Sequence, residues 1–366
     1  MPTAHPLFDL AVIGGGPAGT SAAITAARSG ARVLLLEAIE FPRHKVCGEF
    51  ISAESLGVLA DLLRDSPAGQ ALLRSAPKLG RARLFLGNRR IEAPVSPAGV
   101  SIPRYDLDAA LWQAASAAGV EALAHCEVTS LSGDGPFAAT TAFGARNASA
   151  VVIAAGRWSQ LTPDRVVPAG PKWIGLKAHF REAAASFSSD LYFFDHGYCG
   201  VQPVSANVVN VSAMVRSDFA TSLQQVFRLH PRLAQRAASW ECVTRSISTA
   251  PLIYRQSRPT LGNKLYAGDA AAFIDPFVGD GISIALRSGR VAAECLRPFF
   301  RGEAALADCA SRYEREYARQ FAPLLSAASR VRSLLSLPVV ARAAVFELLR
   351  IPGLVPLMIR KTRRAS

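Results

Sequence analysis

Three glycines and one acidic residue near the N-terminus have the types and spacing of a dinucleotide-binding site. Gly14, Gly16 and Gly19 follow an apolar run, and Glu37 closes a second apolar run. In this pattern the first glycine allows a tight turn, the second lets the backbone approach a pyrophosphate, and the third lets a helix pack on the sheet. The N-terminus of that helix offers N–H groups and partial positive charge to phosphates, and the acid accepts hydrogen bonds from ribose hydroxyls. A purely structural glycine turn is the alternative; the strand before and the helix after favour the dinucleotide.

A second segment narrows the choice of dinucleotide. Asp269 ends a short apolar run, and Gly279 and Gly281 precede a long apolar helix. The carboxylate can bond a sugar-alcohol hydroxyl, and the helix N–H groups can face the electron-rich edge of a flavin and stabilise its anionic reduced form. The alternative is a capped helix that contains two glycines. Taken with the first segment, the pattern favours FAD.

The elements that must position these residues form an α/β pattern. An apolar segment, 150–154, ends at Gly156 as a central parallel strand does, and helices are predicted over 53–64, 219–238 and 281–296. A further helix runs from 102–108 to about residue 118 with Asp106 as its cap, and 121–131 reads as one strand. Alternating segments between 173 and 215 indicate an antiparallel sheet.

This order predicts a Rossmann-like, FAD-binding three-layer domain that is interrupted by an antiparallel-sheet substrate lobe and followed by C-terminal helices. We assign residues 1–75, 100–165 and 256–325 to the FAD-binding domain and 76–99 and 166–255 to the lobe. Residues 326–366 form a C-terminal helical segment with a basic tail.

Composition fits a globular protein of the cytoplasm. The chain has 366 residues, of which 50% are hydrophobic and 19% charged, so a large core is available. Its six cysteines stand singly without CxxC spacing, which indicates reduced thiols, and its six histidines form no ligand cluster, so no metal site is expected. The start of the chain lacks the features of a signal peptide, and no apolar stretch is long enough to span a bilayer.

The net charge of +13 suggests an anionic partner. Aromatic residues are not interleaved with the basic ones and no nucleic-acid-binding signature is present, so no nucleic-acid partner is expected. Residues 334–359 are apolar with isolated arginines and end in the basic run 360–364. This segment is either an amphipathic helix at the inner membrane face or a helical hairpin on the core with a solvated tail.

Several separated motifs together resemble the FAD-dependent oxidoreductases with the p-hydroxybenzoate hydroxylase fold, and within them the geranylgeranyl reductase-like branch. The resemblance covers about 9–293 and rests on GGGPAG at 14–19, FPRHKVCGE at 41–49, PRYDLDAAL at 103–111, AAGRWS at 154–159, GYCGVQPV at 197–204 and AGDAAAFIDPFVGDGISIAL at 267–286.

The resemblance implies roles for residues that match these motifs. The ADP half of FAD is held by Gly14, Gly16, Gly19 and Glu37; the phosphates, ribityl chain and flavin ring are met by Arg43, Arg104, Gly156, Asp269, Gly279, Gly281 and Ile282. Arg104 has the alternative of neutralising Asp106 or Asp108 at the surface.

Four further residues are candidates for the reaction itself. Cys47 and Glu49 match the loop beside the flavin ring, where the thiol could position substrate, donate a proton or only pack. Tyr198 and Cys199 could line the substrate cavity, with core packing as the alternative.

Departures from the family patterns bear on the reaction. The run 154–156 reads Ala-Ala-Gly where many hydroxylases have Ala-Asp-Gly, no W-x-W pair of a halogenase is present, and 198–203 only partly matches the reductase segment Y-x-W-x-F-P. The incomplete reductase segment favours a flavin monooxygenase that acts on a lipophilic, polyketide- or isoprenoid-like small molecule. NAD(P)H is a candidate electron donor, although the Ala-Ala-Gly run departs from the family pattern for its use. The alternatives are a geranylgeranyl reductase-like enzyme that saturates C=C bonds and a membrane- or partner-associated electron-transfer flavoprotein.

Overall fold

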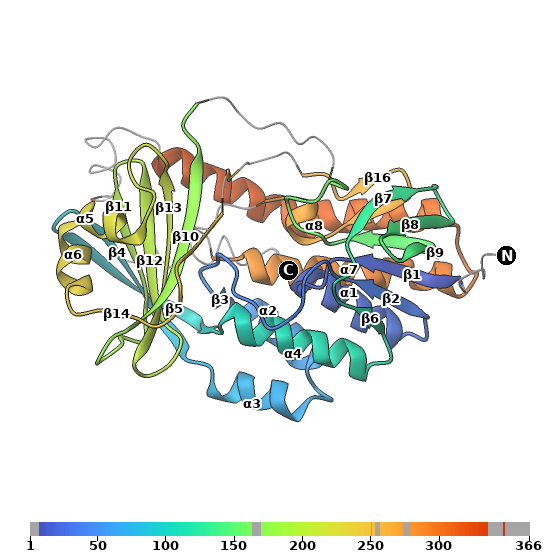
Figure 1. Ribbon diagram of the computed structural model, residues 1–366, viewed down its shortest axis with the longest axis horizontal. Helices are drawn as coiled ribbons and strands as arrows, with labels where there is room; N and C mark the ends of the chain where they lie inside the picture. The colour runs from blue at the N-terminus through green and yellow to red at the C-terminus, as the bar shows by residue number, and fades with distance from the viewer. Residues whose placement is uncertain are drawn as a thin grey trace.

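The computed structural model describes residues 7–162, 170–249, 251–252, 257–273, 279–335 and 347. Its two sheets lie side by side, one at each end of the long axis (Figure 1). Helices surround the first sheet, and the second carries two short helices on its outer face.

The first sheet has the parallel core that binds dinucleotides in α/β proteins. Its path runs β16-β17-β9-β1-β2-β6, and it is parallel from β17 to β6. The strands are β1 (Phe8–Ile13), β2 (Val33–Leu36), β6 (Glu121–Leu123), β7 (Val128–Ser132), β8 (Phe137–Thr141), β9 (Gly144–Ile153), β16 (Thr260–Leu261) and β17 (Lys264–Tyr266). Every residue of β2 is buried, because helices and the β7–β8 hairpin cover both faces of a parallel sheet.

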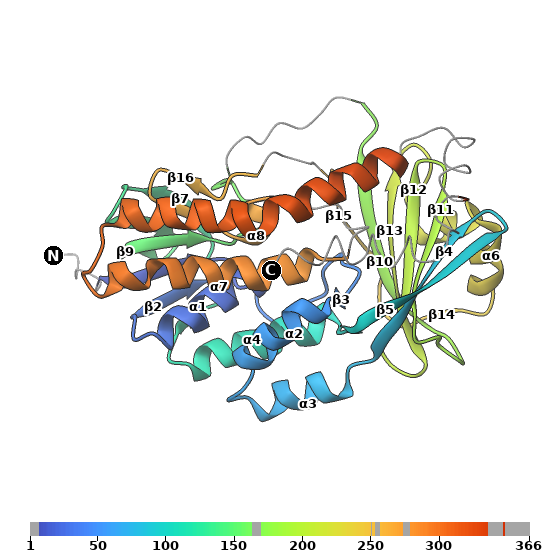
Figure 2. The ribbon, with the colours of Figure 1, turned by 180° about the vertical axis from the view of Figure 1, so that it is seen from behind.

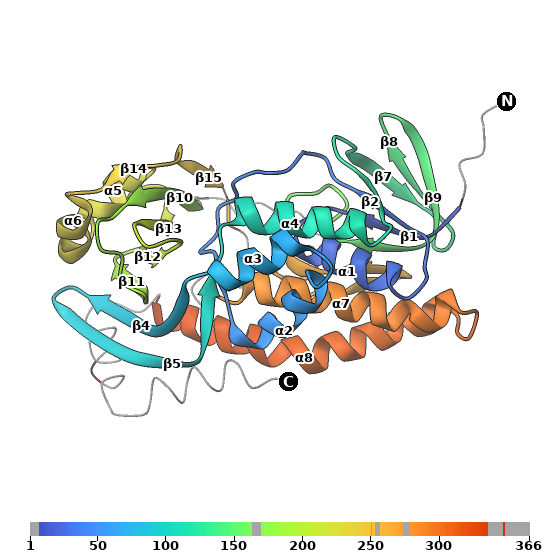
Figure 3. The same cartoon turned by 90° about the horizontal axis from the view of Figure 1, so that it is seen from below.

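Within the described residues, the helices that accompany this sheet are α1 (Pro17–Ala27), α2 (Ala53–Leu62), α3 (Pro67–Ser75), α4 (Arg104–Ala117), α7 (Gly281–Phe300) and α8 (Leu306–Leu335). Figure 2 shows α7 and α8 running side by side, and Figure 3 shows α1, α7 and α8 beside the sheet with the β7–β8 hairpin on its other side. The described helices include none with the length and apolarity needed to cross a membrane.

The second sheet faces the carboxyl ends of the first sheet's parallel strands. Its path is β14-β10-β13-β12-β11-β4-β5-β3, with β15 on β10. The strands are β3 (Phe50–Ile51), β4 (Lys78–Leu86), β5 (Arg89–Ser101), β10 (Trp173–Arg181), β11 (Ser189–Phe194), β12 (Gly197–Pro203), β13 (Val208–Arg216), β14 (Glu241–Cys242) and β15 (Ile247–Thr249). All pairs are antiparallel except β4–β11. At this parallel pair, the β4–β5 hairpin adds to the sheet formed by β10 to β13.

Three local expectations were wrong. Residues 219–238 form two short helices, α5 (Leu223–Arg228) and α6 (Pro231–Ala237), because Pro231 lacks the N–H that would continue the first. The stretch 121–131 is two strands separated by a turn with His125 at a φ of 53°. Helix α4 begins at Arg104, and Asp106 is not its cap. Instead the distant Glu49 accepts a hydrogen bond from the Arg104 N–H at 2.8 Å.

Candidate cofactor and active site

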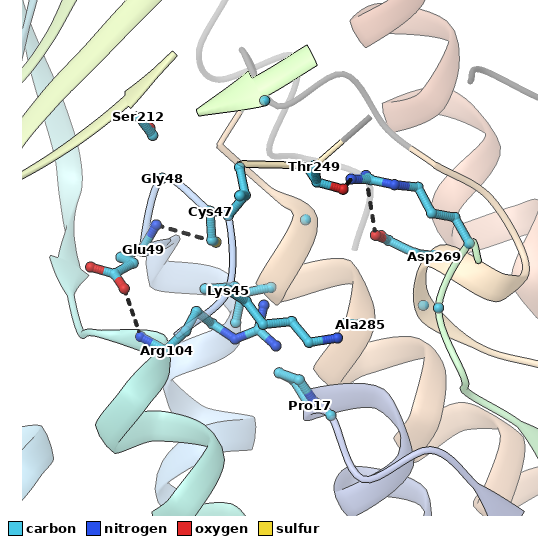
Figure 4. Close-up of a pocket in the computed structure, with 18 of the residues that line it drawn as sticks. Pro17, Lys45, Cys47, Gly48, Glu49, Arg104, Ser212, Thr249, Asp269 and Ala285 are labelled. Atoms are coloured by element: carbon cyan, nitrogen blue, oxygen red, sulfur yellow. Dashed lines mark hydrogen bonds and ion pairs between the residues drawn. The ribbon is translucent and has the colours of Figure 1, made fainter. Parts of the chain in front are cut away.

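A large cavity lies between the two sheets, with a volume of about 1160 Å³. This exceeds the roughly 300–1,000 Å³ of an ordinary small-molecule site, so a cofactor and a second molecule have room together. One part of its wall comes from the carboxyl ends of the parallel strands, where α/β proteins bind nucleotides. Figure 4 shows residues from both sides of this cavity.

The glycine turn is shaped as the sequence predicted. Gly14 has a φ of 104°, and a Cβ there would lie 2.5 Å from the carbonyl oxygen of Ala154. A Cβ on Gly19 would lie 1.8 Å from the carbonyl oxygen of Gly14. Gly16 lines the cavity and precedes α1, and no side chain caps this helix end. The positive end of the helix dipole is therefore open to an anion in the cavity.

Glu37 lies in the cavity wall at the end of β2 and is already oriented by the chain. Its Oε2 accepts from the N–H of Gly15 at 2.8 Å, and its Oε1 accepts from Ile39 N–H at 3.1 Å and Arg43 Nη1 at 2.9 Å. Burial alone would raise the pKa of this carboxyl, but the hydrogen bond and charge of Arg43 outweigh it, so the pKa lies below the usual value. An ionised carboxylate has about four lone-pair sites, so acceptor capacity remains for ribose hydroxyls.

Cationic groups in the cavity fit the phosphates of FAD. Arg43 has a buried Nε without a partner in the described part of the chain. Lys45 projects into the cavity, where burial and the charges of Arg104 and Arg43 lower its pKa. Arg157 lies 3.9 Å from the Asp269 carboxylate. Together with Asp269 for a ribityl hydroxyl, this donor and acceptor set would hold FAD.

The remaining cofactor candidates also line the same cavity: Gly156, Asp269, Gly279, Gly281 and Ile282. Gly19 does not line the cavity, because it packs against the backbone of the glycine turn at Gly14. Arg104 lines the cavity too, but its guanidinium is held by both carboxylate oxygens of Asp108, at 2.7 and 2.6 Å. The alternative that Arg104 neutralises Asp108 is therefore confirmed, but the pair is buried and not at the surface.

Cys47 and Glu49 belong to one tight turn beside Arg104 (Figure 4). The Sγ of Cys47 accepts from the Glu49 N–H at 3.3 Å, and its carbonyl accepts from Asn210 Nδ2 at 3.1 Å. Burial raises the pKa of the Cys47 thiol, although the Arg104 charge opposes the shift. The thiol is therefore protonated near neutral pH, and Cys47 lines the cavity.

The second sheet supplies an apolar wall. Tyr198 lines the cavity among the apolar side chains Leu84, Leu191, Phe193, Met214, Leu252 and Phe273. Cys199, by contrast, does not line the cavity, which corrects the expectation from sequence. Successive strand residues face opposite sides, so Cys199 packs in the core beneath α5 and α6, and burial raises its pKa to about 12.

Sequence reasoning missed Lys45, Lys177 and His179. Lys45 was visible inside the FPRHKVCGE motif, between Arg43 and Cys47. Lys177 and His179 stand two positions apart in the apolar strand β10, and both are buried. The sequence signal that could have identified them is the presence of two polar residues on one face of an apolar strand. A buried charge requires a partner, so such residues indicate a buried cluster of charged groups.

Known proteins support this assignment. A family model described as FAD dependent oxidoreductase matches residues 9–152. Digeranylgeranylglycerophospholipid reductase 2 of Methanopyrus kandleri is 27% identical over 86% of this chain and 83% of its own length. Menaquinone reductase of Mycobacterium tuberculosis is 26% identical over 79% of this chain and 76% of its own.

The solved structure of the flavin-dependent brominase Bmp2 shares the fold, with a TM-score of 0.78 over 98% of this chain and 93% of its own at 20% identity. The glycine turn, the oriented Glu37 and the cationic cavity thus agree with these comparisons. The chain is thus similar to the FAD dependent oxidoreductases over residues 9–152, to two enzymes named as reductases over most of its length, and to the flavin-dependent brominase in its fold.

Proposed function

We propose that this enzyme uses FAD to saturate C=C bonds of a lipophilic, isoprenoid-like substrate. The observation that carries the proposal is the placement of the Cys47 thiol in a cavity whose far wall is apolar. Burial raises the pKa of this thiol, which favours the protonated form. Two relatives named as reductases, for a digeranylgeranylglycerophospholipid and for menaquinone, support it.

The apolar wall binds the hydrocarbon chain and excludes water from the reacting bond. Reduced FAD, when bound, supplies the hydride that one carbon of the double bond receives. Cys47 donates its Sγ proton to the other carbon, so the C=C bond becomes a C–C bond with two new C–H bonds. The Arg104 guanidinium stabilises the thiolate left behind, which water then reprotonates.

Hydroxylation of a lipophilic substrate by molecular oxygen, which the sequence favoured, is the second candidate. The incomplete match of 198–203 to the reductase segment supports it. Product mass separates the two: saturation adds two hydrogen atoms, and hydroxylation adds one oxygen atom.

The test incubates FAD-loaded enzyme with a polyprenyl substrate or menaquinone without oxygen, using dithionite, NADH or NADPH as the reductant. We expect a product heavier by two hydrogens. An oxygenated product that forms only in air, with oxygen uptake, would replace the reductase with the monooxygenase. The Cys47→Ser variant should lower saturation by roughly 10²–10⁴-fold while still binding FAD. Cys242→Ser, at an exposed cysteine, is the matched control and should be unchanged.

Peripheral membrane contact, with or without an electron-transfer partner, is a separate proposal that rests on sequence. The basic run 360–364 lies outside the described residues. Deletion of 360–366 should weaken sedimentation with anionic vesicles and leave FAD content unchanged; unaltered sedimentation would remove the proposal.

A further inference from the structure

A buried cluster of charged and polar side chains lies against the Cys47 turn. Glu49 is fully buried, Lys177 is 1% exposed and His179 is 5% exposed. The Nζ of Lys177 bonds Oε1 of Glu49, and Nε2 of His179 lies 2.8 Å from Oε2. The Glu49 carboxylate therefore receives the Arg104 N–H from α4 and two side chains from β10.

This carboxylate anchors a backbone that Glu49 alone would not favour. Glu49 has a φ of 61°, in the left-handed region that suits glycine. Its N–H contacts Cys47 Sγ, and its carbonyl accepts from Ile102 N–H at 3.0 Å. The contacts of the side chain thus hold the turn in the conformation that places the thiol.

The charges around the thiol come from three elements. Strand β10 contributes Lys177 and His179; α4 contributes Arg104, Asp106 and Asp108; the loop before β3 contributes His44 and Lys45. The ring of His44 meets that of His179 edge-on, with centroids 5.5 Å apart.

Burial would raise the pKa of Glu49, but the hydrogen bond from His179 and the charge of Lys177 outweigh it, so the pKa is lowered and the group stays ionised. The negative charge of Glu49 favours the neutral thiol at Cys47, and the positive charge of Lys177 favours the thiolate.

We propose that Lys177 and His179 are positioning residues for Cys47: from the second sheet, they hold the Glu49 carboxylate that fixes the turn and sets the charge around the thiol. The role of Cys47 as a proton donor rests on the proposed function, whereas its placement can be measured without turnover.

The test measures the rate at which iodoacetamide alkylates Cys47 between pH 6 and 10, in FAD-free and FAD-loaded protein, by mass spectrometry of its peptide. The exposed Cys242 in the same sample is the internal reference. We expect Lys177→Met to raise the apparent pKa of Cys47 and Glu49→Gln to lower it, each by about one unit, or about tenfold in rate below the midpoint. Lys177→Arg, which keeps the charge, should restore the wild-type profile.

A folded Lys177→Met protein with the wild-type Cys47 profile would overturn the proposal, as would shifts of the two variants in the same direction. If Lys177→Met does not fold, two variants of His179 provide the test. His179→Gln keeps a donor for Glu49 and should retain the profile, and His179→Leu should change it; identical profiles would overturn the proposal. If the alkylation profiles shift as expected but no saturated product forms, the proposed function is refuted and the positioning role of Lys177 and His179 stands.

Discussion

Arg43 Nη1 lies 2.9 Å from Oε1 of Glu37, so the loop that carries Cys47 also orients the acid at the end of β2. The Arg43 guanidinium additionally stacks on the Phe41 ring, 4.7 Å from its centroid. The Arg43–Glu37 pair therefore connects the loop of Cys47 with the residue that is expected to bind the ribose.

Replacement of Glu37 should therefore weaken cofactor binding. Glu37→Gln removes the charge that holds Arg43 and that would accept hydrogen bonds from the ribose; hydrogen bonds to charged groups contribute about 1.5–3 kcal/mol. We expect the Kd for FAD, measured by fluorescence titration, to rise at least about tenfold. Glu40→Gln is the control, since Glu40 is exposed and pairs with His125. Equal affinities of the two variants would show that Glu37 does not contact the cofactor.

The glycine turn permits a steric test with a matched partner. Gly14 and Gly30 both have positive φ, of 104° and 89°, but a Cβ on Gly30 would meet no atom within 4 Å. Gly30→Ala should cost only backbone strain of about 1–3 kcal/mol. Gly14→Ala adds the overlap with Ala154 and should abolish FAD binding as well as lower the Tm further. If the two variants lose the same Tm and both bind FAD, the turn tolerates a side chain.

The parts predicted from sequence are those encoded locally. The segment from Asp9 to Glu37 contains its own strand, glycine turn, helix, second strand and acid, and the structure confirms that arrangement. The cluster at Glu49 was not predicted, because strand pairing brings Lys177 and His179 there from 128 and 130 positions away. The cap of α4 was misread for the same reason, since a distant carboxylate replaced the local one.

Tyr198 and Cys199 show a further reason why the sequence could not identify every residue that lines the cavity. Both residues lie in β12 and both are buried. Because apolar side chains are buried on both faces of this strand, the sequence shows no alternation of polar and apolar residues that would reveal which of the two faces the cavity. Only the packing of α5 and α6 against one face distinguishes them.

Gly200 offers a way to shorten the apolar part of the cavity. It lines the cavity on β12, and a Cβ there would make ordinary contacts with Leu191 Cδ2 at 3.5 Å and Ser212 Oγ at 3.6 Å. Gly200→Ala should therefore be tolerated, and Gly200→Leu should extend into the space for substrate. We expect the larger residue to raise KM for a polyprenyl substrate about tenfold or more, with the Kd for FAD unchanged. A rise in the Kd for FAD instead would place the cofactor at this wall.

His230 should make stability depend on pH. It is the N-cap of α6, where Nδ1 accepts from Leu233 N–H at 3.4 Å, and burial together with the charge of Arg232 lowers its pKa to about 4. The unfolded chain, with an ordinary value near 6.5, binds a proton more readily between pH 6.5 and 4, so stability is full above this window and falls with pH inside it. Between pH 7.5 and 5 the loss from this residue should be about 2 kcal/mol.

His230→Asn keeps a good capping side chain and removes the titration, so the free energy of unfolding, measured with urea at both pH values, should lose this part of its pH dependence. Replacing His125 with asparagine is the control, because His125 is exposed and its replacement leaves the buried imidazole in place. Since α6 packs on the face of the second sheet away from the cavity, FAD binding should stay constant in both variants. A dependence between pH 7.5 and 5 that persists in His230→Asn would mean that His230 does not cause it. The buried carboxylates Glu37 and Glu49 do not contribute in this window, because their lowered pKa values place their loss of stability below about pH 4.5.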